Sequence, residues 1–175
     1  VELNLIFQKG VRVVHTPESN MKLSSGVARI PDMIKLGIKP GLGTDSCASN
    51  NDLDMFSEMD TAAKLGKVFS GNPVNMSALT VLKMATSWGA GVMGFQDLTG
   101  TIEPGKKADI ITLDKRTPHM TPLYNPYSSL VYSAEGGDVK DVIVNGKILM
   151  KGGTFLTLDK EEIMGRVRAT CRGIK

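Results

Sequence analysis

Asp45 is the residue whose type and surroundings best suit chemistry. It follows the stretch Gly41 to Thr44, where a glycine-containing strand meets a polar loop that runs to Asn51. In parallel βα folds the loops after the strands build the ligand site. A carboxylate there could bind a divalent cation, or move a proton from a water that the cation activates. It could equally cap the following helix or stabilise the turn.

Two more polar residues are candidates for contact with a substrate. His15 ends the β-branched run that begins at Val11, and no second histidine stands at ligand spacing from it. A supporting role at the wall of a pocket is therefore favoured over metal binding. Ser49 has no nucleophile-elbow sequence around it and suits a hydrogen bond to the substrate or to its own loop. His119, in a proline-flanked loop, is expected to be ordinary surface.

The cysteines offer one alternative chemistry and one indication of location. Cys47 beside Asp45 could be a thiol nucleophile, although no base is evident near it and a small buried cysteine is the commoner case. Cys47 and Cys171 form no CxxC pair, which argues against a disulfide framework and against a thiolate zinc site. A cytoplasmic location is the expectation that follows.

The overall composition excludes several classes of protein. Of 175 residues, 41% are hydrophobic and 22% are charged, as in ordinary globular proteins. The 21 basic and 18 acidic residues are scattered, so no nucleic-acid partner is expected. No apolar run approaches the ~20 residues of a membrane span, so no membrane partner is expected either. Because the sequence starts at Val1 without an initiator methionine or a secretion signal, we expect an internal cut or a trimmed terminus.

The elements that must position Asp45 alternate between helix-like and strand-like segments. This order predicts βα units with parallel strands. Strands are predicted at 11–15 and 39–44, and helices at 2–9, at 30–36, after a cap at Asn51 or Asp52, and from Ser77 to Gly94. The helix after Asn51 or Asp52 is predicted from apolar residues at helical spacing, namely Leu53, Phe56, Met59, Ala62 and Ala63.

The pattern changes to short strands and turns after Gly94, which indicates a boundary near Phe95. A strand is predicted at 109–113, and the pair Asn145-Gly146 predicts a two-residue hairpin turn between 142–144 and 147–150. Asp159 and Glu162 form a capping-box pattern that predicts a final helix.

Several stretches together resemble the amidohydrolase superfamily. They are His15 to Gly26, Gly43 to Met55, Gly100 to Ile110, and Val139 to Lys147. They are most similar to the branch that holds methylthioadenosine/S-adenosylhomocysteine deaminases, with its chlorohydrolase and guanine-deaminase relatives. The resemblance covers nearly the whole chain, and several motifs in the family's order are more specific than any single one.

The resemblance implies an α/β fold, the C-terminal part of a (β/α)₈ TIM-like barrel followed by part of a small β-sandwich. Residues 1–95 would hold the last two barrel strands and their helices, 96–158 the sandwich portion, and 159–175 a C-terminal helix. Asp45 would match the family's final metal-binding carboxylate, which also accepts a proton from the attacking water. Ser49 and His15 would lie near the substrate. Ser46 stands where the family commonly has glycine.

The activity that the resemblance implies is hydrolysis of a non-peptide C–N bond. The substrate would be an aminated purine nucleoside or a related heterocyclic amine, attacked by hydroxide on a divalent metal, with zinc preferred and iron open. A chlorohydrolase or cyclic amidase of the same superfamily is the first alternative. A noncatalytic binding or assembly module is the second.

The family's His-x-His pair and its other metal-binding histidines are missing from this sequence, which has two histidines in all. One carboxylate does not satisfy a cation that takes three or more protein ligands. The isolated chain is therefore expected to bind metal weakly or not at all and to be inactive. We expect it to associate with a missing N-terminal portion or to form a homo-oligomer.

Overall fold

The computed structural model describes residues 2–173 and shows an α/β chain, as predicted. Contacts divide the described residues into two compact units. The first unit contains the residues up to Lys106 together with Lys115–Asp138, and the second contains Lys107–Asp114 together with the residues from Val139 onward. Val1, Ile174 and Lys175 lie outside the described residues. The predicted cut before Val1 and the last two residues of the predicted region 159–175 lie there too. No described helix has the length and apolar character needed to cross a membrane.

Two short strands of the first unit run parallel, as the βα pattern predicts. Strand β1 (Val14–His15) pairs with β2 (Gly41–Leu42) in the register Val14 with Gly41 and His15 with Leu42. Both are shorter than the predicted ranges 11–15 and 39–44. Because the two strands run parallel, their carboxyl ends are adjacent, and the segments that follow them leave the sheet on the same side.

The strand that leads to Asp45 is built almost without side chains on one of its faces. A Cβ added to Gly41 would lie 3.3 Å from the Cα of Gly89, and one added to Gly43 would lie 3.2 Å from Cγ1 of Val14. The backbone of another segment thus approaches β2 more closely than an ordinary side chain permits. This packing accounts for the glycines that make the strand difficult to recognise by composition.

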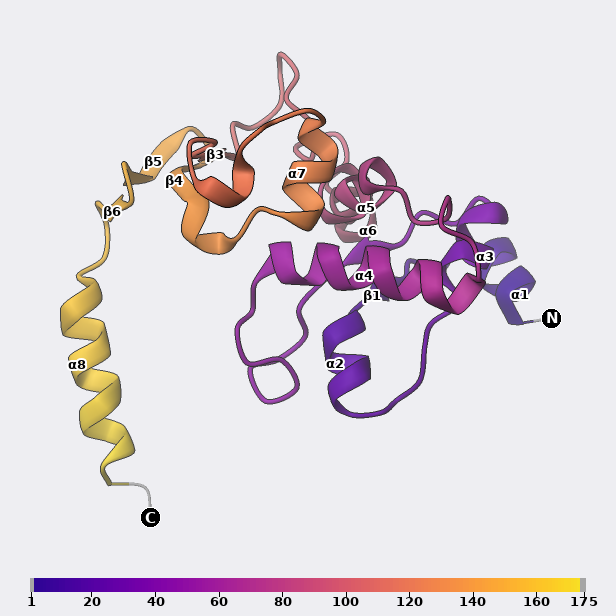
Figure 1. Cartoon of the computed structure of the whole chain (residues 1–175), viewed down its shortest axis with the longest axis horizontal. Helices are drawn as coiled ribbons and strands as arrows, with labels where there is room; N and C mark the ends of the chain where they lie inside the picture. Colours follow the sequence, from indigo (N-terminus) through magenta and orange to yellow (C-terminus); the bar gives the residue numbers. More distant parts are fainter. Residues whose placement is uncertain (1, 174–175) are drawn as a thin grey trace. The chain divides into compact units, whose positions relative to one another are not determined.

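The first unit also contains several helices (Figure 1). They are α1 (Glu2–Gln8), α2 (Pro17–Lys22), α3 (Ile30–Lys35), α4 (Met55–Ser70), α5 (Ala78–Ala85), α6 (Ser87–Met93) and α7 (Pro126–Tyr132), with short 3₁₀ helices η1 (Pro118–Met120) and η2 (Gly136–Asp138). Of these, α4, α5 and α6 contact β2. Neither α2 nor α7 was predicted. Pro17 and Pro126 each occupy the first helical turn, where a missing N–H costs nothing, so each proline starts a helix instead of marking a loop.

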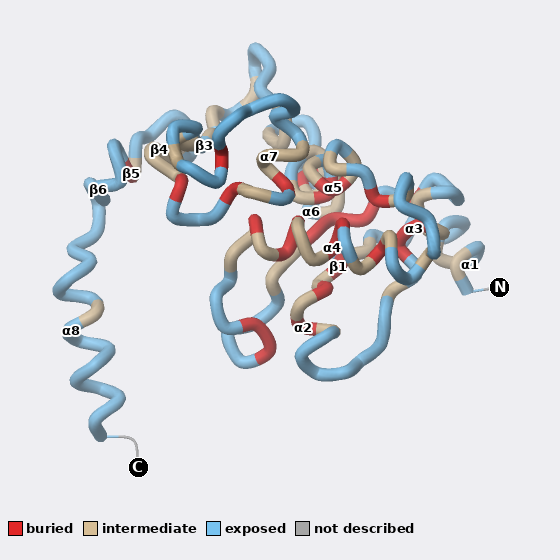
Figure 2. Tube along the Cα trace, in the orientation of Figure 1, coloured by how far each residue is buried: buried red, intermediate tan, exposed pale blue. Residues whose placement is uncertain are grey.

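Helix α4 carries much of the first unit's core, and buried residues gather around it and the strands in Figure 2. Four of the five predicted apolar positions are buried in α4, namely Phe56, Met59, Ala62 and Ala63. The fifth, Leu53, precedes the helix and is 41% exposed, so that part of the prediction was wrong. Burying a side chain of methionine size contributes roughly 1.5–3 kcal/mol. The cap is Asp54, whose side chain accepts from the amide of Phe56 at 2.8 Å, so the prediction of Asn51 or Asp52 was wrong.

The predicted single helix from Ser77 to Gly94 is two helices, α5 and α6, separated at Thr86. The backbone of Thr86 (φ −125°, ψ −97°) is not helical, and its hydroxyl donates to the carbonyl of Leu82 at 2.7 Å. A β-branched residue that bonds the preceding turn in this way bends or interrupts a helix. Hydrophobic spacing continues across the break, which is why periodicity alone predicts one helix.

The second unit contains an antiparallel sheet in the order β3-β4-β5-β6. Its strands are β3 (Ile110–Leu113), β4 (Val139–Val144), β5 (Lys147–Lys151) and β6 (Thr154–Phe155). The predicted hairpin is confirmed: Asn145 (φ 51°) and Gly146 (φ 78°) join β4 to β5, and both have the positive φ that a type I′ turn needs.

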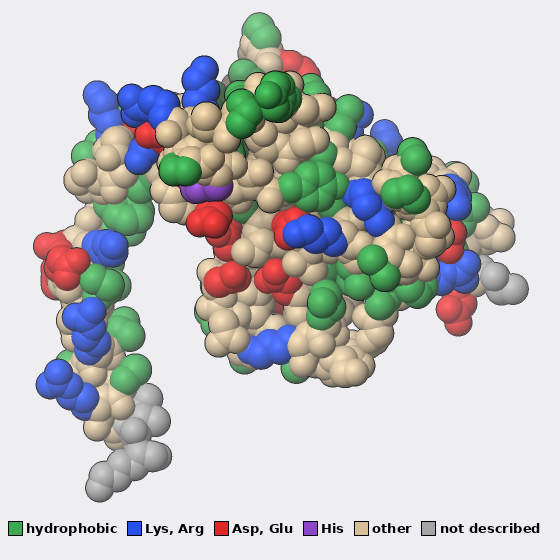
Figure 3. Space-filling model, viewed as in Figure 1, with side chains coloured by type: hydrophobic (Ala, Val, Ile, Leu, Met, Phe, Trp, Pro, Cys, Tyr) green, Lys and Arg blue, Asp and Glu red, His purple; other side chains and the backbone are tan. Residues whose placement is uncertain are grey.

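Helix α8 (Lys160–Cys171) follows the sheet, and its predicted cap is confirmed. The side chain of Asp159 accepts from the amide of Glu162 at 2.9 Å. Acidic side chains stand in its first turn and basic ones further along, an order that suits the helix dipole and is visible in Figure 3. Ile163 and Val167 are 43% and 56% exposed.

The compact units do not follow chain order. The predicted regions 1–95, 96–158 and 159–175 run consecutively, whereas residues 115–138 belong to the first unit because α7 packs against α4 and α5. The described residues of the second unit contain a single sheet, so the β-sandwich stays a prediction about the whole protein.

His119 is exposed, as predicted, but its ring is paired with a buried carboxylate. Its Nε2 lies 2.8 Å from Oδ2 of Asp138, a carboxylate that is 4% exposed. This hydrogen bond raises the pKa of His119 above its ordinary value. Burial raises the pKa of Asp138, but the hydrogen bonds from His119 and from the amide of Glu135 outweigh burial, so that pKa lies below the ordinary value.

We expect the pair to make stability depend on pH. Because the folded-state pKa of His119 lies above the unfolded value of 6.5, its contribution is complete below 6.5 and is lost as pH rises through the folded pKa. The urea midpoint of the chain should therefore fall as pH rises above 6.5, and H119Q should flatten that fall. An equal fall in H119Q would show that another group is responsible.

Candidate functional site

The segments that leave β1 and β2 bring the candidate site together. The amide of Gly43 donates to the carbonyl of His15 at 3.0 Å, which holds the ends of the two strands side by side. Helix α2 follows β1 directly, and the polar loop with Asp45 follows β2. The site is thus at the carboxyl ends of parallel strands, where such folds place their ligands.

Asp45 is held in an unusual conformation with its carboxylate fixed by two hydroxyls. Its φ is 63°, in the left-handed region that non-glycine residues seldom occupy and that occurs often at functional sites. Ser19 donates to its Oδ2 at 2.6 Å, and Ser49 donates to the same oxygen at 2.8 Å. The hydrogen bonds from Ser19 and Ser49, with a smaller one from the backbone of Ser46, lower the pKa of Asp45. Asp45 is exposed, so an anionic carboxylate faces outward at neutral pH.

Ser49 lies in the same loop as Asp45, and Asp45 is one of its hydrogen-bond partners. It is 7% exposed, and besides Asp45 it lies 3.1 Å from the hydroxyl of Ser46. The structure therefore brings Ser49 and Asp45 together. Contact between Ser49 and a substrate stays a prediction.

His15 ends β1 as a buried and uncharged residue. It is 4% exposed, and burial lowers its pKa to about 4, so the imidazole is neutral at physiological pH. Its Nδ1 has no hydrogen-bond partner among the described residues. The structure thus shows a free acceptor or donor at the strand end, and the role of His15 in a pocket wall stays a prediction.

Sequence reasoning missed Ser19 and a buried acid, Glu58 of α4. Glu58 is 0% exposed, and its Oε1 accepts from the side-chain amide of Asn50 at 2.6 Å. Its Oε2 lies 3.4 Å from the backbone N–H of Glu18. Burial raises the pKa of Glu58 to about 7, although the bonds from Glu18 and Asn50 oppose that rise. A glutamate beside the apolar positions of a helix gives no signal of this role.

Cys47 is exposed, so the expectation that it is a small buried residue was wrong. Cys47 and Cys171 are both free thiols.

The described residues do not complete a metal site. Between residues 2 and 173 no group of three His, Cys, Asp or Glu side chains is placed so that it could hold a metal ion. Asp45 itself suits a cation, because its carboxylate is exposed and its lowered pKa keeps it anionic. A protein site needs at least three ligands for a catalytic zinc ion, so Asp45 alone would not hold one.

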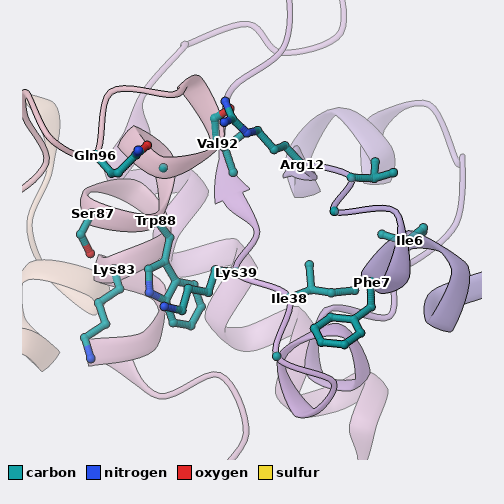
Figure 4. Close-up of a pocket in the computed structure, with 14 residues that line it drawn as sticks. Ile6, Phe7, Arg12, Ile38, Lys39, Lys83, Ser87, Trp88, Val92 and Gln96 are labelled. Atoms are coloured by element: carbon teal, nitrogen blue, oxygen red, sulfur yellow. The ribbon is translucent and has the colours of Figure 1, made fainter.

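A large cavity of the first unit lies elsewhere. It has a volume of about 740 Å³ and is bordered by Arg12, which precedes β1, and by Ile38 and Lys39, which precede β2. Figure 4 shows Trp88 and Lys83 on one side of it and Ile6 and Phe7 on the other. It is thus at the amino ends of the strands, opposite to Asp45, where parallel barrels maintain the fold.

Comparison with known proteins gives a consistent group of relatives. The model of the amidohydrolase family matches residues 1–149. The chain is 52% identical over 167 residues to 5-methylthioadenosine/S-adenosylhomocysteine deaminase 1 of Syntrophus aciditrophicus (strain SB), a match that covers 95% of the chain and 38% of the relative. It therefore spans about 38% of the length of that curated relative.

Solved structures similar to the chain include the following two. An adenosine deaminase from Xanthomonas campestris with bound zinc matches with a TM-score of 0.94 and 39% identity, over 96% of the chain and 38% of that protein. The atrazine chlorohydrolase TrzN from Arthrobacter aurescens TC1, complexed with zinc, matches with a TM-score of 0.90 and 26% identity, over 96% of the chain and 37% of that protein.

Proposed function

The chain belongs to the amidohydrolase family, as its resemblance predicted, and on that basis we propose that it is the C-terminal portion of a metal-dependent deaminase. The substrate we propose is an aminated purine nucleoside or a related heterocyclic amine. The names of the deaminases from Syntrophus aciditrophicus and Xanthomonas campestris support this choice. The observation that carries the proposal is Asp45, an anionic carboxylate fixed by two hydroxyls at the carboxyl ends of parallel strands.

Asp45 has two roles in this proposal. It is one ligand of a divalent cation, for which the bound zinc of two relatives supports zinc, with iron left open. Such a cation, when bound, lowers the pKa of a water towards ~7. Because Asp45 is anionic, it can also accept the proton that the attacking water gives up. Ser49 and His15 would border the heterocycle.

The remaining metal ligands would come from a portion of the protein outside this chain. The chain spans about 38% of its relative, and its described residues offer Asp45 without a complete set of ligands. In this proposal β1 and β2 are the last two strands of a (β/α)₈ barrel, and the sheet of the second unit is part of a small β-sandwich. Association of identical chains is the alternative way to cover the barrel portion. The free thiols of Cys47 and Cys171 support a cytoplasmic location.

A second reaction has one specific observation in its favour. The chlorohydrolase from Arthrobacter aurescens TC1 matches the chain closely in fold, at lower identity than the deaminases. An activated water could displace chloride from a ring as well as ammonia, and a cyclic amide is a third possible target. A noncatalytic binding or assembly module is the reading that remains if none of these reactions occurs.

The test is an assay of the whole protein loaded with zinc. Ammonia release would be measured with 5-methylthioadenosine, S-adenosylhomocysteine and adenosine, and chloride release with a chlorotriazine. Ammonia release from a purine nucleoside supports the proposal. Chloride release alone supports the chlorohydrolase, and the absence of both products from a zinc-loaded protein contradicts enzymatic function on these substrates.

A further inference from the structure

Both hydroxyls that fix Asp45 come from segments that a single buried side chain holds. Ser19 lies in α2, which follows β1, and Ser49 lies in the loop that follows β2. The neighbour of each serine contacts Glu58 of α4: Glu18 stands next to Ser19, and Asn50 stands next to Ser49.

The two carboxylate oxygens of Glu58 divide this work between them. Oε2 faces the backbone N–H of Glu18 at 3.4 Å, and Oε1 accepts from the side-chain amide of Asn50 at 2.6 Å. Glu58 is 0% exposed, so water does not compete for these oxygens. One rigid side chain therefore fixes the spacing of two segments that are far apart in the sequence.

Asn50 links the same segments a second time and has no bonding capacity left over. Its amide group also donates to Oε2 of Glu18 at 3.3 Å, and its Oδ1 accepts from the backbone amides of Asp52 and Leu53. Two donors and two acceptor positions are the full capacity of an asparagine side chain. Thr61, also in α4, donates to Oε1 of Glu18 at 2.9 Å, so α4 holds the segment after β1 at two points.

Purely structural duty would not require an acid at this position. A buried carboxyl is costly, and an apolar side chain of similar volume commonly gives equal or better stability. An apolar side chain at position 58 would, however, leave the Glu18 amide and the Asn50 side chain without this acceptor. The remaining bond from Asn50 to Glu18 would then lose its support from the buried carboxylate of α4. The need to hold Ser19 and Ser49 in place thus explains why position 58 is a glutamate and not an apolar residue.

We propose that Glu58 is a positioning residue, which acts through Glu18 and Asn50 to hold the Ser19 and Ser49 hydroxyls on the carboxylate of Asp45. The inference deepens the proposed function, because its effect on catalysis rests on the role of Asp45 there. Its structural part stands independently, since it concerns the order of two segments, 16–23 and 43–54.

The experiment uses the whole protein and three variants, E58L, E58Q and the control M59A. E58L removes both acceptors, whereas E58Q keeps one carbonyl oxygen. Met59 is the next residue of α4 and is 4% exposed, so M59A weakens the same helix without touching the carboxyl. Backbone hydrogen exchange of segments 16–23 and 43–54, kcat and KM are measured for each protein.

E58L is expected to raise exchange in both segments on the order of tenfold and to lower kcat on the order of 10²-fold with little change in KM. E58Q should lie between E58L and the unchanged protein in both measurements. M59A should lower the melting temperature without a selective rise of exchange in the two segments.

Equal exchange of the two segments in M59A and the Glu58 variants would overturn the proposal, as would a kcat of E58Q and E58L equal to that of the unchanged protein. If E58L does not fold, E58Q against M59A gives the same decision. The exchange measurement separates this inference from the proposed function. Absence of deaminase activity in every protein contradicts the function, while selective exchange in the Glu58 variants still supports the positioning role.

Discussion

Replacing Asp45 by asparagine is expected to lower kcat/KM of the whole protein on the order of 10³-fold or more. Asparagine has the same shape, but it carries no negative charge for a cation and does not accept a proton at neutral pH. Its amide group would also meet the hydroxyls of Ser19 and Ser49, which now donate to a single carboxylate oxygen. The measurement is steady-state kinetics with the preferred nucleoside, together with the zinc content of the purified variant.

D32N is the matched control for this prediction. Asp32 is a partly exposed residue of α3 that pairs with Arg29 at 2.8 Å on the surface, so its loss should leave kcat/KM within a factor of about two. A D45N protein that keeps its zinc and its full activity would remove Asp45 from the chemistry. It would also remove the observation on which the proposed function depends.

The 175-residue chain on its own is expected to release no ammonia above background, and activity should appear when the rest of the protein is supplied as a separate polypeptide. The physical reason is that residues 2–173 contain no group of three metal-binding side chains. With the second polypeptide present, ammonia release should rise on the order of 10³-fold or more, because the ligands and Asp45 then surround one cation. Zinc retained after gel filtration should increase in parallel.

The control for complementation is the same mixture made with the D45N chain. It should stay at background, which would show that the chain contributes its carboxylate and not only its packing surface. Deaminase activity of the 175-residue chain alone would contradict the prediction, and equal activity of the D45N mixture would assign the chemistry to the other polypeptide.

Local residue types were enough to predict the centre of the candidate site. A carboxylate after a glycine-containing strand predicted Asp45 at a strand end, and the parallel pairing of β1 with β2 confirms that environment. The partners of Asp45 were only half predicted. Ser49 was predicted to bond the substrate or its own loop, and Asp45 belongs to that loop. Ser19 is 26 residues away from Asp45 along the chain and meets it only through the strand pairing.

Glu58 could not be predicted because its role depends on tertiary packing. In the helical pattern it is one charged residue beside the apolar Phe56 and Met59, a pattern that usually indicates solvent contact. The structure instead places the segments after β1 and β2 against that side of α4. The same limit applies to Thr86 and Pro126, whose backbone conformations end or start helices that hydrophobic spacing does not mark.

The glycines at 41 and 43 have a practical consequence for anyone who maps this protein by random mutagenesis. Neither has a side chain that could meet a ligand, yet an added methyl group would lie 3.3 Å and 3.2 Å from its nearest neighbours, so even alanine would disturb the strand that carries the acid. In a screen that scores turnover alone, substitutions at these two positions would lower the score in the same direction as substitutions at Asp45. Only a parallel measurement of folded protein per cell would distinguish a variant that fails to fold from a variant that folds but lacks the proposed catalytic carboxylate.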